Sequence, residues 1–443
     1  MRYGNTKSIR EDIFSFYTSV ATYESRKSYA HVVFGRSLLH RLFAALRAVA
    51  LQLAAALRAP GPVPDIALQD KVWVFFSTKN QYDSLRFLGE GASNLVFVGI
   101  DPRAGSLVTE PDPFVLLPVH ARLPIRHVAA YRSVVFRTLR RSPAQFFRMA
   151  HYFVLGIGLY EEFGKTIAAY RPRLIVLGND HAVHCRAMMQ AGRTAGVPTV
   201  YFQHASVTEH FPCLRVDYAC LEGRDALDKY AVAGTSENTR CLLVGMPKFD
   251  RHFHHRNTSD RVRTIGIAIN STDVLSDVRS MLAEVLAACP GLSLRIRMHP
   301  ADPRELAFEP SPADAARVDY SAGAKESAFE FLESVDMIVS GNSSIHLEAV
   351  LLNVYSVYCS LNPEVDVYGY VANGLVDEAR TLPELIEIIR ELRLHKPPNR
   401  HRAKYYYAPL DTEWDGRSGE LGRQIVRNIS AGLPVDGLSL PLA

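Results

Sequence analysis

The chain has 443 residues, of which 48% are hydrophobic and 22% are charged. A single hydrophobic core stops growing near about 250–300 residues, so this length predicts two domains. The composition excludes a chain that is disordered throughout, a collagen and an ordinary multi-span membrane protein. The formal net charge of +4 is too small to indicate nucleic-acid binding, but it suits an anionic small substrate or an anionic membrane surface.

The cysteines and the first residues predict a cytoplasmic protein. Six cysteines are scattered along the chain without a CxxC motif, which is typical of reduced, mostly buried thiols in the cytosol. The first residues are polar and charged, and no apolar segment with a cleavage site follows them. We therefore expect no secretory signal.

An apolar run within residues 1–66 has two interpretations. From Leu42 to Leu57 only Arg47 and Gln52 are polar, and the run is shorter than the about 20 apolar residues that span a bilayer. It is either a helix buried in the core or between domains, or an interfacial helix that contacts anionic lipid on the inner face of the cell membrane. The flanking charges that favour the second interpretation are Arg36, Arg41 and Arg58.

Short apolar segments that end in polar residues follow, and they alternate with helical segments. This pattern is typical of buried parallel strands with helical connections. We predict strands at Val72–Ser77, Asn94–Ile100, Phe114–Val119, Leu174–Gly178, Thr199–Phe202, Val216–Leu221 and Arg240–Val244. Helices are predicted within 128–170, with a break at Pro143, and after Asp180 as far as Ala195.

After a polar segment at 251–260 the alternation begins again. We predict strands at Thr264–Ile269, Ser293–Met298, Met337–Ser340 and Val354–Tyr358, and helices at Asp273–Ala288, Phe329–Ser334, Ser343–Leu352 and Leu382–Leu394. Two such blocks predict an α/β chain with two doubly wound, Rossmann-like domains. No P-loop and no GxGxxG motif is present, which argues against a kinase and a dehydrogenase.

The predicted organisation has five parts. An N-terminal helical extension at 1–66 precedes a first Rossmann-like domain at 67–250. A linker at 251–262 leads to a second Rossmann-like domain at 263–398. A C-terminal tail at 399–443 crosses back to the first domain.

Arg297 and His299 lie where the predicted strand Ser293–Met298 ends. In open α/β sheets ligands bind outside the carboxyl ends of the strands, so both side chains would lie near a bound ligand. Pro300 keeps the backbone of His299 extended and ends the strand. We predict that both residues bind a phosphate group; the alternative is that they are ordinary polar surface residues.

A polar segment from Gly341 to Ser344 follows the strand Met337–Ser340. The glycine permits a tight turn, and the two serines open a helix whose N–H groups are suited to phosphate. We predict that Gly341, Asn342, Ser343 and Ser344 bind the phosphate of a nucleotide ligand. Glu348 and Asn270 are predicted to bind its ribose or base. The alternative is an ordinary serine cap followed by an acidic residue in the first turns.

In the first domain, His204 and Asp180 each follow a predicted strand. A histidine at such a position can act as a base or bind phosphate, and a carboxylate beside histidines can accept a proton from a hydroxyl group. We predict that one of the two is the catalytic base. His204 ranks first, because Asp180 is also well placed to cap the next helix.

No metal site and no cofactor are predicted. His252, His254 and His255 lie in a polar segment without an acidic or cysteine partner at fixed helical spacing. No Asp-x-Asp motif occurs in the first half of the chain, and the nearest approach, at residues 110–112, precedes a predicted strand instead of following one. We therefore expect protein groups alone to meet the phosphate charge.

At these motifs the chain resembles glycosyltransferases of the two-domain GT-B fold, and in particular bacterial capsule and surface-polysaccharide transferases. In bacterial sialyltransferase groups, an His-Pro motif and a Ser-Ser motif hold the phosphate of a CMP-sugar. The matching residues here are His299-Pro300 and Ser343-Ser344. The acidic catalytic motif of that family is not evident in this chain.

Teichoic-acid polyol-phosphate transferases are similar as well. They carry a strand-end His-Gly motif and a later histidine, which match His204 and His299, although Ala205 replaces the glycine. The resemblance covers residues 170–425. It implies two Rossmann-like domains that face a central cleft, with a last helix that crosses back onto the first domain.

The resemblance implies an inverting, metal-independent glycosyltransferase of bacterial surface polysaccharide synthesis. Its donor would be a nucleotide-activated sugar, with a CMP-sugar slightly favoured. Its acceptor would be a hydroxyl group of a glycan, free or lipid-linked. The alternatives are a CDP-polyol (glycerol or ribitol) phosphotransferase, a sugar-nucleotide epimerase and a non-catalytic assembly protein.

Overall fold

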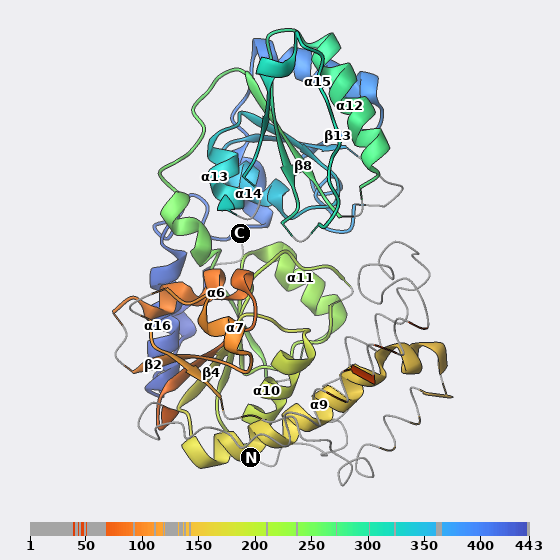
Figure 1. Ribbon diagram of the computed structural model, residues 1–443. Helices are drawn as coiled ribbons and strands as arrows, with labels where there is room; N and C mark the ends of the chain where they lie inside the picture. Colours follow the sequence, from red (N-terminus) through yellow and green to blue (C-terminus); the bar gives the residue numbers. More distant parts are fainter. Residues whose placement is uncertain are drawn as a thin grey trace. The chain divides into compact units, whose positions relative to one another are not determined.

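The chain forms two compact units in the computed structural model (Figure 1). Unit 1 consists of two segments, Met1–Lys248 and Arg417–Leu442, and unit 2 comprises Phe249–Gly416. The structure describes residues 39, 43, 46, 47 and 50 and residues 68–440, apart from 92–93, 110–111, 118, 120–131, 133–135, 137–138, 141–142, 210, 236–237, 272, 301, 323–324 and 360–365.

Unit 1 is built on a parallel sheet with the strand order β3-β2-β1-β4-β5-β6-β7. Its strands are β1 (Val72–Phe75), β2 (Leu95–Gly99), β3 (Phe114–Leu116), β4 (Leu174–Leu177), β5 (Thr199–Phe202), β6 (Tyr218–Leu221) and β7 (Arg240–Leu243). The central strands are buried on both faces, which explains why they are apolar at every position. The strand order reverses between β1 and β4, so this is the topological switch point of the sheet.

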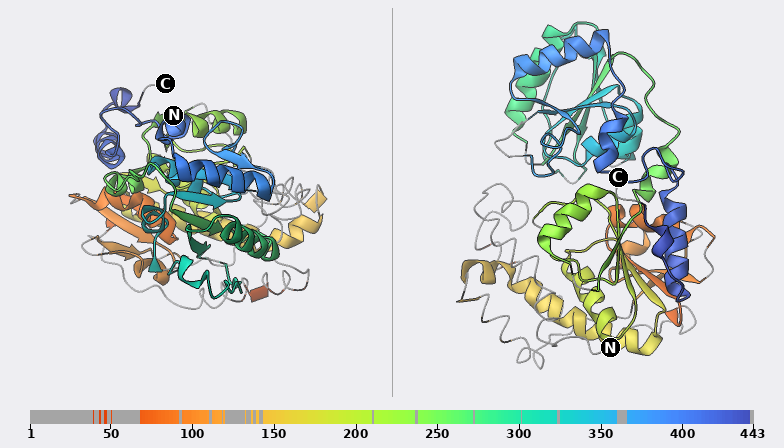
Figure 2. Two further views of the ribbon diagram at one scale, coloured as in Figure 1. Left: turned by 90° about the horizontal axis from the view of Figure 1, so that it is seen from above. Right: turned by 180° about the vertical axis from the view of Figure 1, so that it is seen from behind.

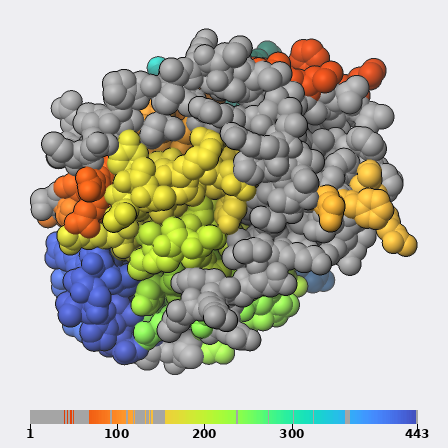
Figure 3. Space-filling view, turned by 90° about the horizontal axis from the view of Figure 1, so that it is seen from below, coloured from red at the N-terminus to blue at the C-terminus, as the bar shows by residue number. Residues whose placement is uncertain are grey.

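Helices cover both faces of this sheet (Figures 1 and 2). On one face, α9 (Pro143–Tyr170) and α10 (Val183–Thr194) pack side by side, and the ring of Phe163 lies 5.6 Å from that of Phe75. Figure 3 shows α9 in yellow at the surface of unit 1. On the other face lie α6 (Lys79–Leu85), the 3-10 helix η1 (Arg86–Gly89) and α16 (Ser418–Ser430).

The C-terminal helix α16 packs on unit 1 through a glycine. A Cβ atom on Gly422 would lie 2.8 Å from the ring of Phe87 and 3.0 Å from that of Phe202, so only glycine permits this close approach. Arg423 donates to the carbonyl oxygen of Phe87 at 3.0 Å. These contacts hold a segment from the end of the chain against the first sheet.

Unit 2 is built on a second parallel sheet, with the order β10-β9-β8-β11-β12-β13. Its strands are β8 (Thr264–Ile269), β9 (Ser293–Met298), β10 (Val318–Tyr320), β11 (Met337–Ser340), β12 (Tyr355–Cys359) and β13 (Asp377–Ala379). Helices α12 (Leu275–Ala288) and α15 (Leu382–Leu394) bury their apolar sides against one face. On the other face lie α13 (Ala328–Glu333) and α14 (Ile345–Leu351), and the switch point falls between β8 and β11.

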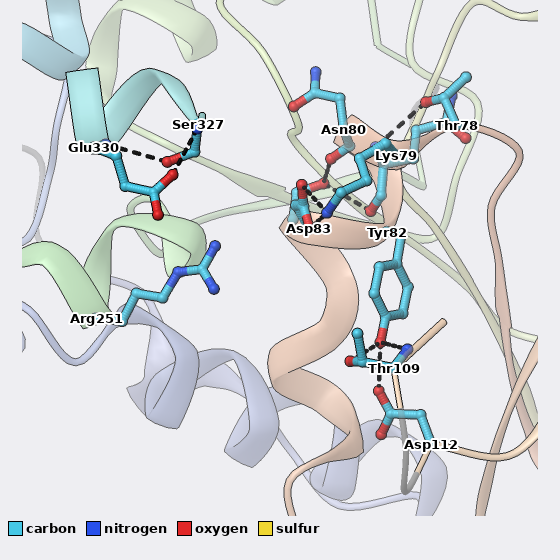
Figure 4. Close-up of polar contacts among 12 residues, drawn as sticks. Thr78, Lys79, Asn80, Tyr82, Asp83, Thr109, Asp112, Arg251, Ser327 and Glu330 are labelled. Carbon is cyan, nitrogen blue, oxygen red and sulfur yellow. Dashed lines mark hydrogen bonds and ion pairs between the residues drawn. The ribbon is translucent and has the colours of Figure 1, made fainter. Parts of the chain in front are cut away.

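Side-chain hydrogen bonds cap the first turns of α13 and α6 and connect α6 to a neighbouring loop (Figure 4). Ser327 and Glu330 form a reciprocal capping box at the start of α13. In unit 1, Thr78 caps α6, and the hydroxyl group of Tyr82 donates to Asp112 at 2.9 Å. This last bond ties α6 to the segment that precedes β3.

Most predicted strands are confirmed. The bounds of β5, β8, β9 and β11 agree with the prediction to the residue, and so do those of α15. The prediction missed β10 and β13, which are three-residue strands at the two edges of the second sheet. Their sequences, VDY and DEA, lack the apolar run that marks a buried strand.

Most of the apolar run at Leu42–Leu57 lies outside the described residues. Within it, Phe43 and Leu46 are 67% and 62% exposed on a helix, and its contact with lipid stays a prediction. No helix among the described residues is long and apolar enough to cross a membrane. The six cysteines are thiols rather than disulfides, and four of them are buried.

Candidate active site

The polar residues predicted in unit 1 lie at the carboxyl edge of neighbouring strands. β4 and β5 pair in parallel, with Leu177 opposite Tyr201, so Asp180 and His204 follow the same edge of the sheet. Asn179 connects the two loops, because its Nδ2 atom lies 3.3 Å from Nε2 of His204. The structure therefore brings the two predicted base candidates together beside the switch point.

Asp180 is fully buried, and both of its carboxylate oxygens have partners. His181 Nδ1 lies 3.0 Å from Oδ1, and the hydroxyl group of Tyr230 donates to Oδ2 at 2.7 Å. Burial raises the pKa of Asp180, but the bonds from His181 and Tyr230 outweigh this effect and hold the pKa below its usual value. The carboxylate is thus charged at neutral pH.

The alternative role of Asp180 as a helix cap is wrong. The residue before α10 is Ala182, which makes no side-chain cap, and the oxygens of Asp180 point to other partners. Asn179 is the residue whose side chain accepts from the backbone here, from the N–H groups of His181 at 3.0 Å and Ala182 at 2.6 Å. The buried carboxylate therefore has no role in starting this helix.

His204 is buried, with 8% of its surface exposed. Burial and the nearby His181 lower its pKa to about 3, so the ring is neutral at physiological pH. Its Nδ1 atom has no hydrogen-bond partner among the described residues. A buried polar atom without a hydrogen-bond partner is rare and lowers the stability of the fold, so this nitrogen is suited to bind a ligand atom.

Prediction from sequence did not assign a role to His181. Its side chain is 24% exposed, while Asp180 behind it is fully covered, and its ring lies 4.8 Å from that of Phe211. The available signal was the run of three polar residues from Asn179 to His181 directly after a buried strand. Only the fold shows that the carboxylate of this run faces inward and the imidazole outward.

In unit 2, the predicted residues meet at the switch point between β8 and β11. The side-chain amide of Asn270, after β8, donates to the carbonyl oxygen of Asn342, after β11. The backbone N–H of His299, after β9, donates to the carbonyl oxygen of Ile269 at 2.9 Å. Three neighbouring strand ends thus carry Asn270, His299 and the segment Gly341–Ser344 to one edge of the sheet.

The turn at Gly341 is held from several sides. His346, which is fully buried, has Nε2 2.9 Å from the carbonyl oxygen of Gly341 and Nδ1 2.7 Å from Ser356 Oγ. Because the carbonyl oxygen only accepts, Nε2 carries the proton and Nδ1 accepts from the serine. A Cβ atom on Gly341 would lie 3.1 Å from Asp273 Oδ1, so the close approach favours glycine. Burial lowers the pKa of His346 to about 4, which keeps the ring neutral.

The two serines lie at the open end of this turn. Ser343 and Ser344 are half-buried, and α14 begins at Ile345, two residues later than predicted. Ser343 Oγ accepts from the N–H of Ile345 at 3.4 Å and can still donate its own hydrogen. The predicted ribose or base ligand Glu348 is buried one turn further on, with 7% of its surface exposed.

Arg297 does not extend towards solvent. It is 6% exposed, and its guanidinium group donates to Ser321 Oγ and to the carbonyl oxygen of Glu326, both at 2.9 Å. These contacts do not support a direct bond to phosphate; they hold the segment between β10 and α13. His299, in contrast, is exposed at the end of its strand.

Within the part of the chain that the structure describes, no group of three or more His, Cys, Asp or Glu side chains is arranged to hold a metal ion. His252 instead lies 2.8 Å from Glu333 and stacks on Phe329 at 4.2 Å. His254 and His255 are exposed.

No protein-family model matches the sequence, and no curated protein matches it either. Several solved structures are similar in fold. A candidate UDP-N-acetylglucosamine 2-epimerase from Listeria monocytogenes has a TM-score of 0.54 at 11% identity, covering 83% of this chain and 98% of the other. The glycotransferase of kitacinnamycin has a TM-score of 0.54 at 14% identity, with coverages of 83% and 100%. The wall teichoic acid polymerase TagF, with CDPG, has a TM-score of 0.51 at 12% identity, with coverages of 89% and 98%.

At these identities the likeness concerns the fold. Together with the two parallel sheets, it shows that the chain has the GT-B fold, with two Rossmann-like units. The predicted fold class is confirmed.

Proposed function

We propose that the protein is an inverting, metal-independent glycosyltransferase that uses a nucleotide-activated sugar in the synthesis of a bacterial surface polysaccharide. One observation carries this proposal. At the switch point of unit 2, Asn270, His299 and the Gly341–Ser344 turn meet at the carboxyl edge of the sheet, where open α/β folds bind their ligands. The glycotransferase and TagF structures, which share the fold, support a transfer reaction.

In this proposal the donor phosphate binds at the turn. The hydroxyl groups of Ser343 and Ser344 and the ring of His299 donate to phosphate oxygens, where negative charge develops as the bond to the sugar breaks. Glu348 and Asn270 remain the proposed ribose or base ligands. A base in unit 1 takes the proton of the acceptor hydroxyl, whose oxygen attacks the anomeric carbon from the opposite side and inverts it.

Two other reactions on this fold compete with the proposal. The likeness to the Listeria protein supports a sugar-nucleotide epimerase, and the TagF structure with CDPG supports a CDP-polyol phosphotransferase. Incubation with a CMP-sugar, UDP-N-acetylglucosamine and CDP-glycerol, each with and without a glycan acceptor, separates them. A glycosyltransferase extends the acceptor without adding phosphorus, a phosphotransferase adds phosphorus, and an epimerase converts its nucleotide-sugar without an acceptor. Either of the last two results would replace the proposal.

Replacing Ser343 and Ser344 together with alanine is expected to weaken nucleotide binding at least tenfold. Each hydrogen bond to a charged group contributes about 1.5–3 kcal/mol, so loss of even one lowers the affinity by at least about tenfold. Calorimetric titration with the preferred nucleotide measures the loss. The matched control is alanine at Ser276 and Ser280, two exposed serines of α12 in the same unit, which should bind as the parent does. Parental affinity of the Ser343/Ser344 variant would remove the phosphate site from this turn.

Transfer activity is expected to continue in the presence of EDTA. The sequence has no Asp-x-Asp pair in its first half, and the proposed phosphate ligands are hydroxyl, imidazole and backbone groups. Initial rates are measured after dialysis against EDTA and again after addition of Mg²⁺ or Mn²⁺. Loss of transfer in EDTA with recovery on adding metal would contradict the metal-independent mechanism.

A further inference from the structure

The amide of Asn179 has a defined orientation in unit 1. Its Oδ1 atom accepts from the backbone N–H groups of His181 at 3.0 Å and Ala182 at 2.6 Å. A backbone N–H can only donate, so the oxygen must lie on this side. The amino group Nδ2 therefore lies on the other side, and it acts there as a donor.

This orientation determines where two imidazole rings carry their protons. Asn179 Nδ2 lies 3.3 Å from Nε2 of His181 and 3.3 Å from Nε2 of His204, so both Nε2 atoms face a donor and must accept. Each neutral ring then carries its hydrogen on Nδ1. The Nδ1–H of His181 donates to Asp180 Oδ1 at 3.0 Å, which agrees with this assignment.

The consequence for His204 is that it cannot serve as a base in this arrangement. Its Nε2 lone pair is directed at Asn179, and its other nitrogen bears a hydrogen and is buried without a partner among the described residues. His204 thus offers a hydrogen-bond donor to a ligand oxygen. Its only lone pair, on Nε2, is buried and faces Asn179, so a substrate proton does not reach it.

His181 has the properties that His204 lacks. Its side chain is 24% exposed, and a charged carboxylate lies behind its Nδ1 atom, ready to stabilise the imidazolium ion. Its Nε2 contact with Asn179 has the same 3.3 Å length as that of His204, but the His181 ring is partly exposed and the His204 ring is buried, so a substrate hydroxyl can reach and displace only the contact of His181.

We propose that His181 is the catalytic base, that Asp180 is its charged partner, and that Asn179 and His204 position the reacting groups; this inference rests on the proposed transferase function. The proton of the acceptor hydroxyl passes to Nε2 of His181. The oxygen forms a bond to the anomeric carbon, and the bond from that carbon to the donor phosphate breaks, with its electron pair going to the phosphate. The imidazolium ion then releases the proton to water.

The tautomers can be measured without any activity. Long-range ¹H–¹⁵N correlation spectra of the full chain, labelled in histidine, distinguish protonated from unprotonated ring nitrogens, and His181→Asn and His204→Asn spectra assign the signals. We expect His204 to carry hydrogen on Nδ1 alone near neutral pH, and the neutral form of His181 to have the same tautomer. A hydrogen on Nε2 of His204 would overturn the assignment, even if no donor substrate had been found.

Paired asparagine variants test the roles in catalysis, because the asparagine nitrogen lies where Nδ1 lies and can donate but cannot take a proton. His181→Asn is expected to lower kcat by about 10²–10⁴-fold, and His204→Asn by no more than about tenfold. Nucleotide affinity and thermal midpoints should stay near parental for both, and added imidazole should restore part of the rate of His181→Ala.

Equal inactivation of the two asparagine variants, or a near-parental rate of His181→Asn, would overturn the inference. If the parent protein transferred no sugar from any of the donors, the proposed function itself would be refuted.

Discussion

Asparagine in place of Asp180 is expected to lower kcat by about 10²–10⁴-fold and to leave the fold intact. The amide oxygen can still accept from Nδ1 of His181, and the amide nitrogen can donate to the hydroxyl oxygen of Tyr230, so the local geometry survives. What disappears is the buried negative charge that, in the proposed mechanism, stabilises the imidazolium ion as the acceptor loses its proton. Steady-state rates at saturating donor and acceptor measure the effect.

The matched control for this variant is Asp228→Asn. Asp228 belongs to the same unit and pairs with Arg224 on helix α11 (Arg224–Ala233), but its side chain is 41% exposed, so loss of its charge should leave kcat near parental. Circular dichroism and thermal unfolding verify that both variants are folded. A fully active Asp180→Asn variant would show that the buried carboxylate takes no part in the reaction.

Both units are expected to lose stability as the pH falls from 6.5 to 5. Burial lowers the pKa of His204 in unit 1 to about 3 and that of His346 in unit 2 to about 4, whereas the ordinary value is 6.5. Below pH 6.5 the unfolded chain binds a proton at each histidine and the native chain does not, so the free energy of unfolding falls with pH. The loss is about 1.4 kcal/mol per pH unit for each ring, or about 2 kcal/mol per ring at pH 5. His184, whose pKa burial lowers to about 4, adds to the loss in unit 1.

Thermal unfolding midpoints of the full chain between pH 5 and 7.5 measure this loss. His346→Gln removes the fully buried histidine of unit 2, so the transition of that unit should lie lower at pH 7.5 but decline less on acidification. His254→Gln is the control, because His254 is exposed and should leave the decline as it is. Midpoints that stay constant between pH 6.5 and 5 would mean that the two rings are protonated in the folded protein.

The candidate sites of the two units are organised in the same way. In each unit the polar residues follow parallel strands next to the switch point, and the side chain of an asparagine connects two neighbouring loops. Asn179 joins the loops after β4 and β5, and Asn270 joins those after β8 and β11. Side-chain bonds between loops hold reactive groups in place more firmly than a loop could by itself.

Much of the fold could be predicted from the sequence. Central strands such as β5 and β11 are short apolar runs bounded by polar residues, because a parallel strand in the middle of a sheet is buried on both faces. The edge strands β10 and β13 could not be predicted, because a strand with one neighbour stays partly solvated and needs no apolar run. Strand order is likewise a tertiary property, since it depends on which apolar faces meet.

The sequence by itself determined that the chain is a two-domain α/β protein and that polar residues cluster where strands end, because both follow from local hydrophobic pattern and turn chemistry. Only the tertiary structure decided what those residues do. The guanidinium group of Arg297 donates to Ser321 and to Glu326 instead of to a ligand. The carboxylate of Asp180 is enclosed by His181 and by Tyr230, which lies 50 residues further along the chain. A side chain's protonation and accessibility depend on such distant neighbours, which no local pattern records.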